Sequence, residues 1–118
     1  MTSKTALGNK GEKLAADFLK NAGMEILNKN FRYGHKEIDI IAKDGNTIAF
    51  VEVKTARSQN FGSPEERVNL KKQKLLIEAA NFFISKNQLD CEGFRFDVVA
   101  IDMQAGPKIL HIKNAFTA

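Results

Sequence analysis

Three ionisable residues in the middle of the chain, Asp39, Glu52 and Lys54, have types and a spacing suited to cutting a phosphodiester bond. One residue separates Glu52 from Lys54, and alternation along a β-strand sends both side chains to the same face. Carboxylates bind hard divalent cations such as Mg²⁺ or Mn²⁺, which supply much of what phosphodiester hydrolysis needs. We therefore expect Asp39 and Glu52 to be metal ligands, with the carbonyl of Val53 able to add another. Lys54 is expected to orient the attacking water or to contact the phosphate.

The same residues also fit a simpler alternative, a charged strand face in water with a Glu52–Lys54 ion pair of little energetic weight. For the bare pattern alone, this alternative is favoured. The surrounding segments, Ile38–Ala42 and Ile48–Thr55, are too rich in β-branched and apolar residues for a sheet margin. Charges embedded there carry a desolvation cost unless a metal or a partner offsets it, so the context favours a functional site.

A hairpin would bring these charges together. Asp44-Gly45 lies between the two segments and is the dipeptide that a two-residue type I′ turn prefers. With that turn, Asp39 lies opposite Phe50 and on the same face as its diagonal neighbour Glu52. Diagonal neighbours lie roughly 7–8 Å apart, which lets two carboxylates converge on one cation.

The rest of the chain predicts two helices and three further strands. Helical spacing of apolar residues predicts a helix over about 6–22 and a second one to about residue 86. The second should begin at Ser63, where Pro64 and Glu66 complete a start signal. Strands are expected over 24–31, 94–102 and 108–113. The order αβββαββ predicts an α/β protein, because the second helix can serve as a crossover in a mixed five-stranded sheet flanked by helices.

Composition predicts one globular domain over residues 1–118. Of the 118 residues, 43% are hydrophobic and 27% charged, which is ordinary for a folded soluble protein. No apolar run is long enough to cross a membrane and no signal peptide is evident, so we expect a cytoplasmic protein. The single cysteine, Cys91, is expected to be a spare thiol. A net charge of +4 is compatible with a nucleic-acid partner without requiring one.

Further candidates lie outside the hairpin. Glu12 sits at the border of the first helix's apolar stripe, so it can point either to the metal site or to water. The basic run from Lys71 to Lys74 on the second helix is either a solvated face or a surface that binds phosphates. His35 and His111 are expected to be ordinary surface or loop residues, and Asp97 to be structural. The candidate nucleic-acid contacts are Arg32, Lys36, Arg57, Lys71, Lys72, Gln73 and Lys74.

Several motifs together resemble the bacterial YraN-like family. They are Gly8-x-x-Gly11-Glu12 opening a helix, Asn30-x-Arg32, Glu37 through Ala42, Phe50 through Lys54, Val68 through Gln73, Ala79-Ala80, and Arg95 through Val99. That family is similar to archaeal Holliday-junction resolvases and belongs to the restriction-endonuclease-like PD-(D/E)xK superfamily.

The resemblance implies a restriction-endonuclease-like αβββαβ core. It also implies that Asp39 and Glu52 are metal ligands and that Lys54 is the catalytic lysine. Glu12 would be an additional acid from the first helix, and Glu37 could assist. Because resolvases cut two strands symmetrically, the resemblance further implies a homodimer.

The expected function is therefore a Mg²⁺- or Mn²⁺-dependent endonuclease acting on DNA, branched DNA included. A second hypothesis is a non-catalytic nucleic-acid-binding or adaptor protein that retains the nuclease fold. A third, a protein-interaction domain, would fit if the basic residues were scattered over the surface. Metal-dependent cleavage separates the first two hypotheses.

Overall fold

The computed structural model of the protein describes residues 6–56, 70–104, 106 and 108–116. Within these residues the elements follow the predicted order of one helix, three strands, one helix and two strands. They are α1 (Ala6–Asn21), β1 (Glu25–Tyr33), β2 (Lys36–Asp44), β3 (Thr47–Ala56), α2 (Leu70–Lys86), β4 (Gly93–Asp102) and β5 (Lys108–Phe116). The predicted start of the second helix at Ser63 lies outside the described residues.

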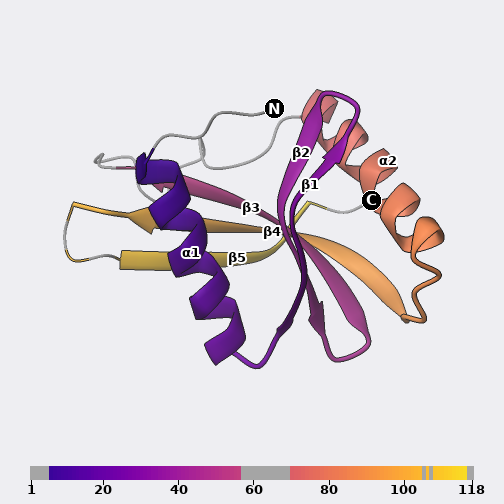
Figure 1. Ribbon diagram of the computed structural model, residues 1–118, viewed down its shortest axis with the longest axis horizontal. Helices are drawn as coiled ribbons and strands as arrows, with labels where there is room; N and C mark the ends of the chain where they lie inside the picture. Colours follow the sequence, from indigo (N-terminus) through magenta and orange to yellow (C-terminus); the bar gives the residue numbers. More distant parts are fainter. Residues whose placement is uncertain (1–5, 57–69, 105, 107, 117–118) are drawn as a thin grey trace.

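The five strands form one mixed sheet in the order β1-β2-β3-β4-β5 (Figure 1). β3 and β4 are parallel, and the other three neighbouring pairs are antiparallel. The α/β class and the mixed five-stranded sheet predicted from the sequence are therefore confirmed. Neither of the two described helices is long and apolar enough to cross a membrane.

The helices cover opposite faces of the sheet, and each closes its own hydrophobic core. The core under α1 contains Leu19 with side chains such as Val51 and Val99, whereas the core under α2 contains Phe83 with side chains such as Phe50. Val51 follows Phe50 directly, so the two cores reflect the alternation of apolar side chains along a strand that is buried on both faces. The predicted apolar character of β2 and β3 is thereby explained.

The turn between β2 and β3 differs from the prediction by one residue. Asp44 pairs with Thr47, so the two turn residues are Gly45 and Asn46 rather than Asp44 and Gly45. Gly45 has a φ of 62°, a conformation that glycine adopts without steric cost. Placing glycine first in the turn fits a type II′ pattern, whereas the predicted turn placed it second.

The predicted pairing of Asp39 with Phe50 is consequently wrong. Phe50 pairs with Ile41, and Val51 pairs with Ile40. The observed register, had it continued one step further, would set Asp39 opposite Glu52, but the pairing ends at Ile40 and Val51. The parity argument survives, because the turn still contains two residues.

β2 and β3 separate where Asp39 and Glu52 lie. β1 and β2 stay paired as far as Tyr33 and Lys36, but the pairing of β2 with β3 ends at Ile40 and Val51. Beyond that point β2 continues with β1 towards α2, while β3 continues beside β4 under α1 (Figure 1). We call this divergence the fork.

A change of face within β2 accompanies the fork. Ile38 and Ile40 should share a face by alternation, yet Ile38 packs in the core under α2 and Ile40 in the core under α1. The strand therefore turns about its axis at Asp39, which lies between them. Sharp local twist of this kind is common where a sheet ends its pairing.

Candidate functional site

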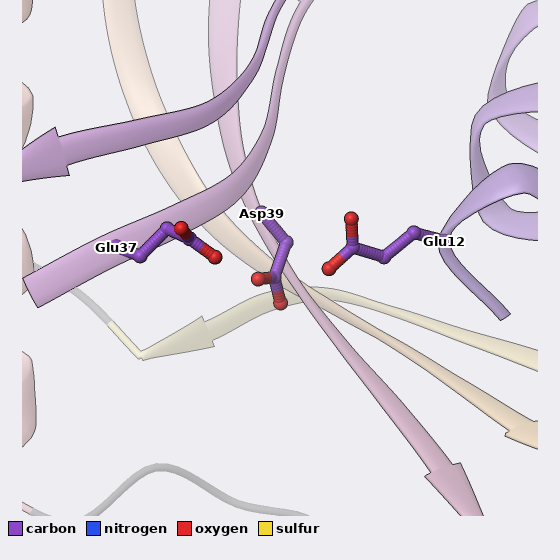
Figure 2. A group of neighbouring side chains, drawn as sticks. All are labelled: Glu12, Glu37 and Asp39. Atoms are coloured by element: carbon purple, nitrogen blue, oxygen red, sulfur yellow. The ribbon is translucent and has the colours of Figure 1, made fainter. Parts of the chain in front are cut away.

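Three carboxylates meet at the fork. One oxygen each of Glu12, Glu37 and Asp39 lies within 4.8 Å of the other two. Figure 2 shows Glu12 reaching from α1 and Glu37 from β2, with Asp39 between them. Of the two orientations open to Glu12 in the sequence, the structure has the inward one, with only 7% of the residue exposed. We call these three residues the acid cluster; the predicted metal ligand Glu52 is not one of them.

Asn30 holds two members of the acid cluster in place. Its side-chain amide donates a hydrogen bond to Oε1 of Glu12 at 2.9 Å and a longer one to Oε1 of Glu37 at 3.5 Å. The backbone of Asn30 is left-handed, with a φ of 57°, a conformation that asparagine tolerates better than most residues. The role of Asn30 was not predicted, although an asparagine inside a strand is unusual enough to have been a signal.

Asp39 is anchored to the opposite branch of the fork. Its Oδ2 accepts a hydrogen bond from the backbone nitrogen of Val53 at 2.8 Å. The carboxylate thus accepts from a backbone N–H group that would otherwise have no partner, because β2 no longer pairs with β3 at this point. Because the N–H and C=O of one strand residue point to the same side, the Val53 carbonyl also faces the acids. Its position suits the ligand role predicted for it.

Glu52 is surrounded by lysines from three elements. Lys72 of α2 forms an ion pair with its Oε1, and Lys36 of β2 lies 3.6 Å from the same oxygen. Lys54 of β3 lies 3.8 Å from Oε2. We call Lys36, Lys54 and Lys72 the lysine trio. The predicted Glu52–Lys54 pair is therefore present as one part of a larger cluster.

The lysine trio controls the charge of Glu52. Burial alone would raise the pKa of this carboxyl, but the hydrogen bond from Lys72 and the charges of the trio outweigh burial and lower the pKa. A carboxylate partner usually raises the pKa of a lysine. For Lys36, however, burial and the neighbouring Lys72 outweigh the attraction of Glu52, so the pKa of its ammonium group is lowered. The site therefore holds an ionised carboxylate beside closely spaced ammonium groups.

The donor set of the fork suits a hard divalent cation. It consists of carboxylate oxygens, with the Val53 carbonyl beside them, which are the ligands that Mg²⁺ and Mn²⁺ prefer. Oε2 of Glu52 is buried and has no hydrogen-bond partner within the described residues. Asp39 and Glu52 also line the same small pocket, together with apolar side chains such as Phe50 and Phe96. A cation there would satisfy an oxygen that the protein leaves without a hydrogen bond.

The basic run of α2 is divided between two surroundings. Lys72 is half-buried and turned to Glu52, whereas Lys71 and Lys74 are exposed. Gln73 is half-buried, and Arg32 is exposed on β1. The predicted contact residue Arg57 lies outside the described residues. The lysine trio gathers around Glu52, and only Lys72 of the α2 run belongs to it.

A second charged cluster lies between β4 and β5, where the expectation for His111 was wrong. Asp97 is almost fully buried and accepts hydrogen bonds from Nε of Arg95 at 3.0 Å and from the backbone nitrogen of Asn114 at 3.1 Å. Nε2 of His111 lies 2.8 Å from its Oδ2. His111 is therefore a partly buried strand residue with a partner, while His35 is exposed in a turn as predicted. The structural role expected for Asp97 agrees with these contacts.

Comparison with known proteins places this chain among one set of bacterial sequences. The model of the uncharacterised protein family UPF0102 matches residues 11–101, a segment that includes the acid cluster and the lysine trio. A UPF0102 protein of Caldicellulosiruptor saccharolyticus is 48% identical over 97% of this chain and 99% of its own length. One of Thermodesulfovibrio yellowstonii is 49% identical over 97% and 98%, and one of Chloroherpeton thalassium 52% identical over 86% and 78%.

Proposed function

The chain belongs to the UPF0102 family, and we propose that it is a metal-dependent endonuclease that hydrolyses phosphodiester bonds in DNA, branched DNA included. One observation carries the proposal: Asp39 and Glu52 lie at the point where two strands diverge, with Lys54 beside them. An arrangement that buries acids and lysines together costs desolvation energy, so a charged ligand is the simplest reason for it.

The fold supports the same assignment. The restriction-endonuclease-like core implied by the sequence resemblance has the order αβββαβ, and the described elements follow that order with β5 added at the edge. The candidate acids lie on its second and third strands, and the lysine follows on the third. We therefore place the protein in the PD-(D/E)xK superfamily as part of this proposal.

The carboxylates of Asp39 and Glu52, with the Val53 carbonyl, would hold Mg²⁺ or Mn²⁺, and Glu12 and Glu37 are close enough to Asp39 to share that task. When bound, the ion would polarise the phosphate and lower the pKa of the attacking water. Asn30 keeps Glu12 and Glu37 in fixed positions through its amide. Held side chains of this kind reduce the cost of assembling the site when substrate arrives.

The lysine trio would bind the scissile phosphate. Ammonium groups donate charge-assisted hydrogen bonds to phosphate oxygens, and three of them already converge on one carboxylate. Lys54 directly follows Val53 in β3 and lies 3.8 Å from Oε2 of Glu52, so we assign to it the role of orienting the water that attacks phosphorus. Lys36 and Lys72 would neutralise the charge that builds up on the phosphate during the reaction.

The test is a cleavage screen with Mg²⁺ or Mn²⁺ on linear, single-stranded, flapped and four-way DNA. Asp39→Asn and Lys54→Met should abolish cleavage while the proteins stay folded. Glu25→Gln and Lys113→Met are matched controls, because both residues are exposed and lie away from the fork, and they should leave cleavage unchanged.

Cleavage that survives in Asp39→Asn and Lys54→Met would show a contaminating nuclease and remove the proposal. No cleavage of any substrate, combined with tight DNA binding by the unaltered protein, would instead favour the non-catalytic adaptor.

A further inference from the structure

A partly exposed group of aromatic rings lies on β1 and α2. Phe82 of α2 is 44% exposed, which is unusual for a ring of this size. It stacks on Phe31 with centroids 6.3 Å apart and lies against Tyr33 at 5.3 Å. We call Phe31, Tyr33 and Phe82 the aromatic platform.

The aromatic platform is fixed to the core from below. Phe31 packs edge-on against the buried Phe83, with ring centroids 5.0 Å apart. The outermost ring, Phe82, carries the ammonium of Lys86 5.7 Å from its centroid. That ammonium lies over the ring, so a stacking base would take its place on the ring face, and the displaced ammonium could pair with the phosphate of the same nucleotide.

The platform is also connected to the proposed active site. Tyr33 pairs across the hairpin with Lys36, whose ammonium lies 3.6 Å from Glu52. A strand whose base rests on the platform would therefore pass its backbone towards the lysine trio.

We infer that the aromatic platform binds an unpaired base of a nucleic acid, so that the preferred substrate contains single-stranded nucleotides beside the bond to be cut. Bases inside a duplex are stacked on one another and offer no free face to a protein ring, whereas unpaired bases do. The cleavage part of this inference rests on the proposed function. Binding of the unpaired base does not depend on cleavage and can be tested without it.

Metal-free binding tests the inference directly. Fluorescence anisotropy in EDTA at one fixed salt concentration would compare a thymidine oligonucleotide, an abasic oligonucleotide of the same length and charge, and a blunt duplex. The unaltered protein should bind the thymidine strand about 10-fold more tightly than the abasic strand, the loss typical for one stacked base. Equal affinity for the two strands would overturn the inference, because phosphates alone would then explain binding.

Variants of Phe82 separate stacking from burial. Phe82→Leu keeps an apolar side chain without a flat ring and should lose the same 10-fold preference, whereas Phe82→Tyr should keep it. Duplex affinity should change less than about twofold in both variants, because it depends on phosphate contacts. Leu110→Ala, at another exposed apolar residue, is the matched control and should behave like the unaltered protein. A Phe82→Leu protein that keeps the full preference would refute the platform.

Two further results distinguish this inference from the proposed function and from a protein interface. If binding depends on the platform but no substrate is cleaved, the platform is supported and the proposed nuclease activity is refuted. If cleavage is unaffected both by Phe82→Leu and by unpaired bases, the nuclease activity is supported and the platform is refuted. Sedimentation completes the test. If the unaltered protein dimerises at assay concentrations and Phe82→Leu alone makes it monomeric, the platform is a contact between copies and the inference fails.

Discussion

Replacing Gly11 with alanine should destabilise the protein, although alanine is the better helix former. A Cβ built on Gly11 would lie 1.9 Å from Cγ2 of Thr55, where α1 crosses β3. Carbon atoms pack at about 3.5–4.0 Å, so the helix would have to move away or Thr55 would have to change its rotamer. Overpacking of this kind costs about 1–3 kcal/mol, against a gain of about 1 kcal/mol from helix propensity.

A double-mutant cycle with Thr55→Ser isolates the close approach. Serine removes Cγ2, and the next atoms of Thr55 lie 3.3 Å and 3.9 Å from the new Cβ. In that background Gly11→Ala should become neutral or stabilising, so the coupling between the two sites should be about 1–3 kcal/mol. Urea unfolding of the four proteins measures each free energy of unfolding.

Gly93→Ala is the matched control, because its added Cβ would meet nothing within 4 Å. The reasoning also extends to the site, because Glu12 follows Gly11 and moves with the helix. Gly11→Ala should therefore weaken the metal-induced rise in melting temperature more than its loss of stability explains. Equal effects of Gly11→Ala with and without Thr55→Ser would show that the helix does not approach β3 closely, and would refute the argument.

Three other outcomes are expected. A metal at ten times its Kd should stabilise the unaltered protein by about 1.4 kcal/mol in thermal melts. Asp39→Asn should lose this shift but keep its metal-free stability, because asparagine can still accept the Val53 hydrogen bond. A full shift in the variant would exclude Asp39 as a ligand. Joint replacement of Lys71 and Lys74 by alanine should weaken DNA binding and reduce its salt slope by about 0.9 per lost phosphate contact, and unchanged affinity would mean a solvated helix face. Burial raises the pKa of Asp97, but its bonds to His111, Arg95 and Asn114 lower it below 3.8 overall, so the stability it contributes is complete above that value and is lost as pH falls through the folded-state pKa. Asp97→Asn should thus cost about 3 kcal/mol near neutral pH in urea unfolding and progressively less towards pH ~2, and a constant difference would contradict the assignment.

The parity of β2 and β3 was predictable because it depends on local rules. Alternation and a two-residue turn fix which residues share a face as far as Ile40 and Val51, and an error in choosing the turn residues did not change that parity. The error itself arose because Asp44-Gly45 and Gly45-Asn46 are both acceptable turn dipeptides. Pairing energy along the whole strand, rather than the turn alone, decides between them. The turn of β2 about its axis at Asp39 was not predicted, and Asp39 lies beside Glu12 of α1 whereas Glu52 pairs with Lys72 of α2.

Contacts between distant elements were harder to predict from the sequence. Lys72 was interpreted as one residue of a basic run, and only the packing of α2 on the sheet brings it to Glu52. The hold of Asn30 on Glu12 requires a left-handed residue within β1, which propensity alone argues against. His111 was misjudged for a related reason, since its partner Asp97 lies on a neighbouring strand rather than at a fixed spacing in the chain.

The parallel pairing of β3 with β4 has a consequence for how the protein folds. Thr47 pairs with Gly93, so this ladder closes a long loop, whereas the two hairpins before it close short ones. Local hairpins form early and long-range parallel pairs form late, because chain entropy must be lost before their contacts form. The core that holds α1 includes Val99 and Ile101 of β4, so Glu12 reaches its final position only after that late step. A chain still emerging from the ribosome would thus carry Glu37 and Asp39 before it carries a complete acid cluster, which would form only once β4 has been made and has docked.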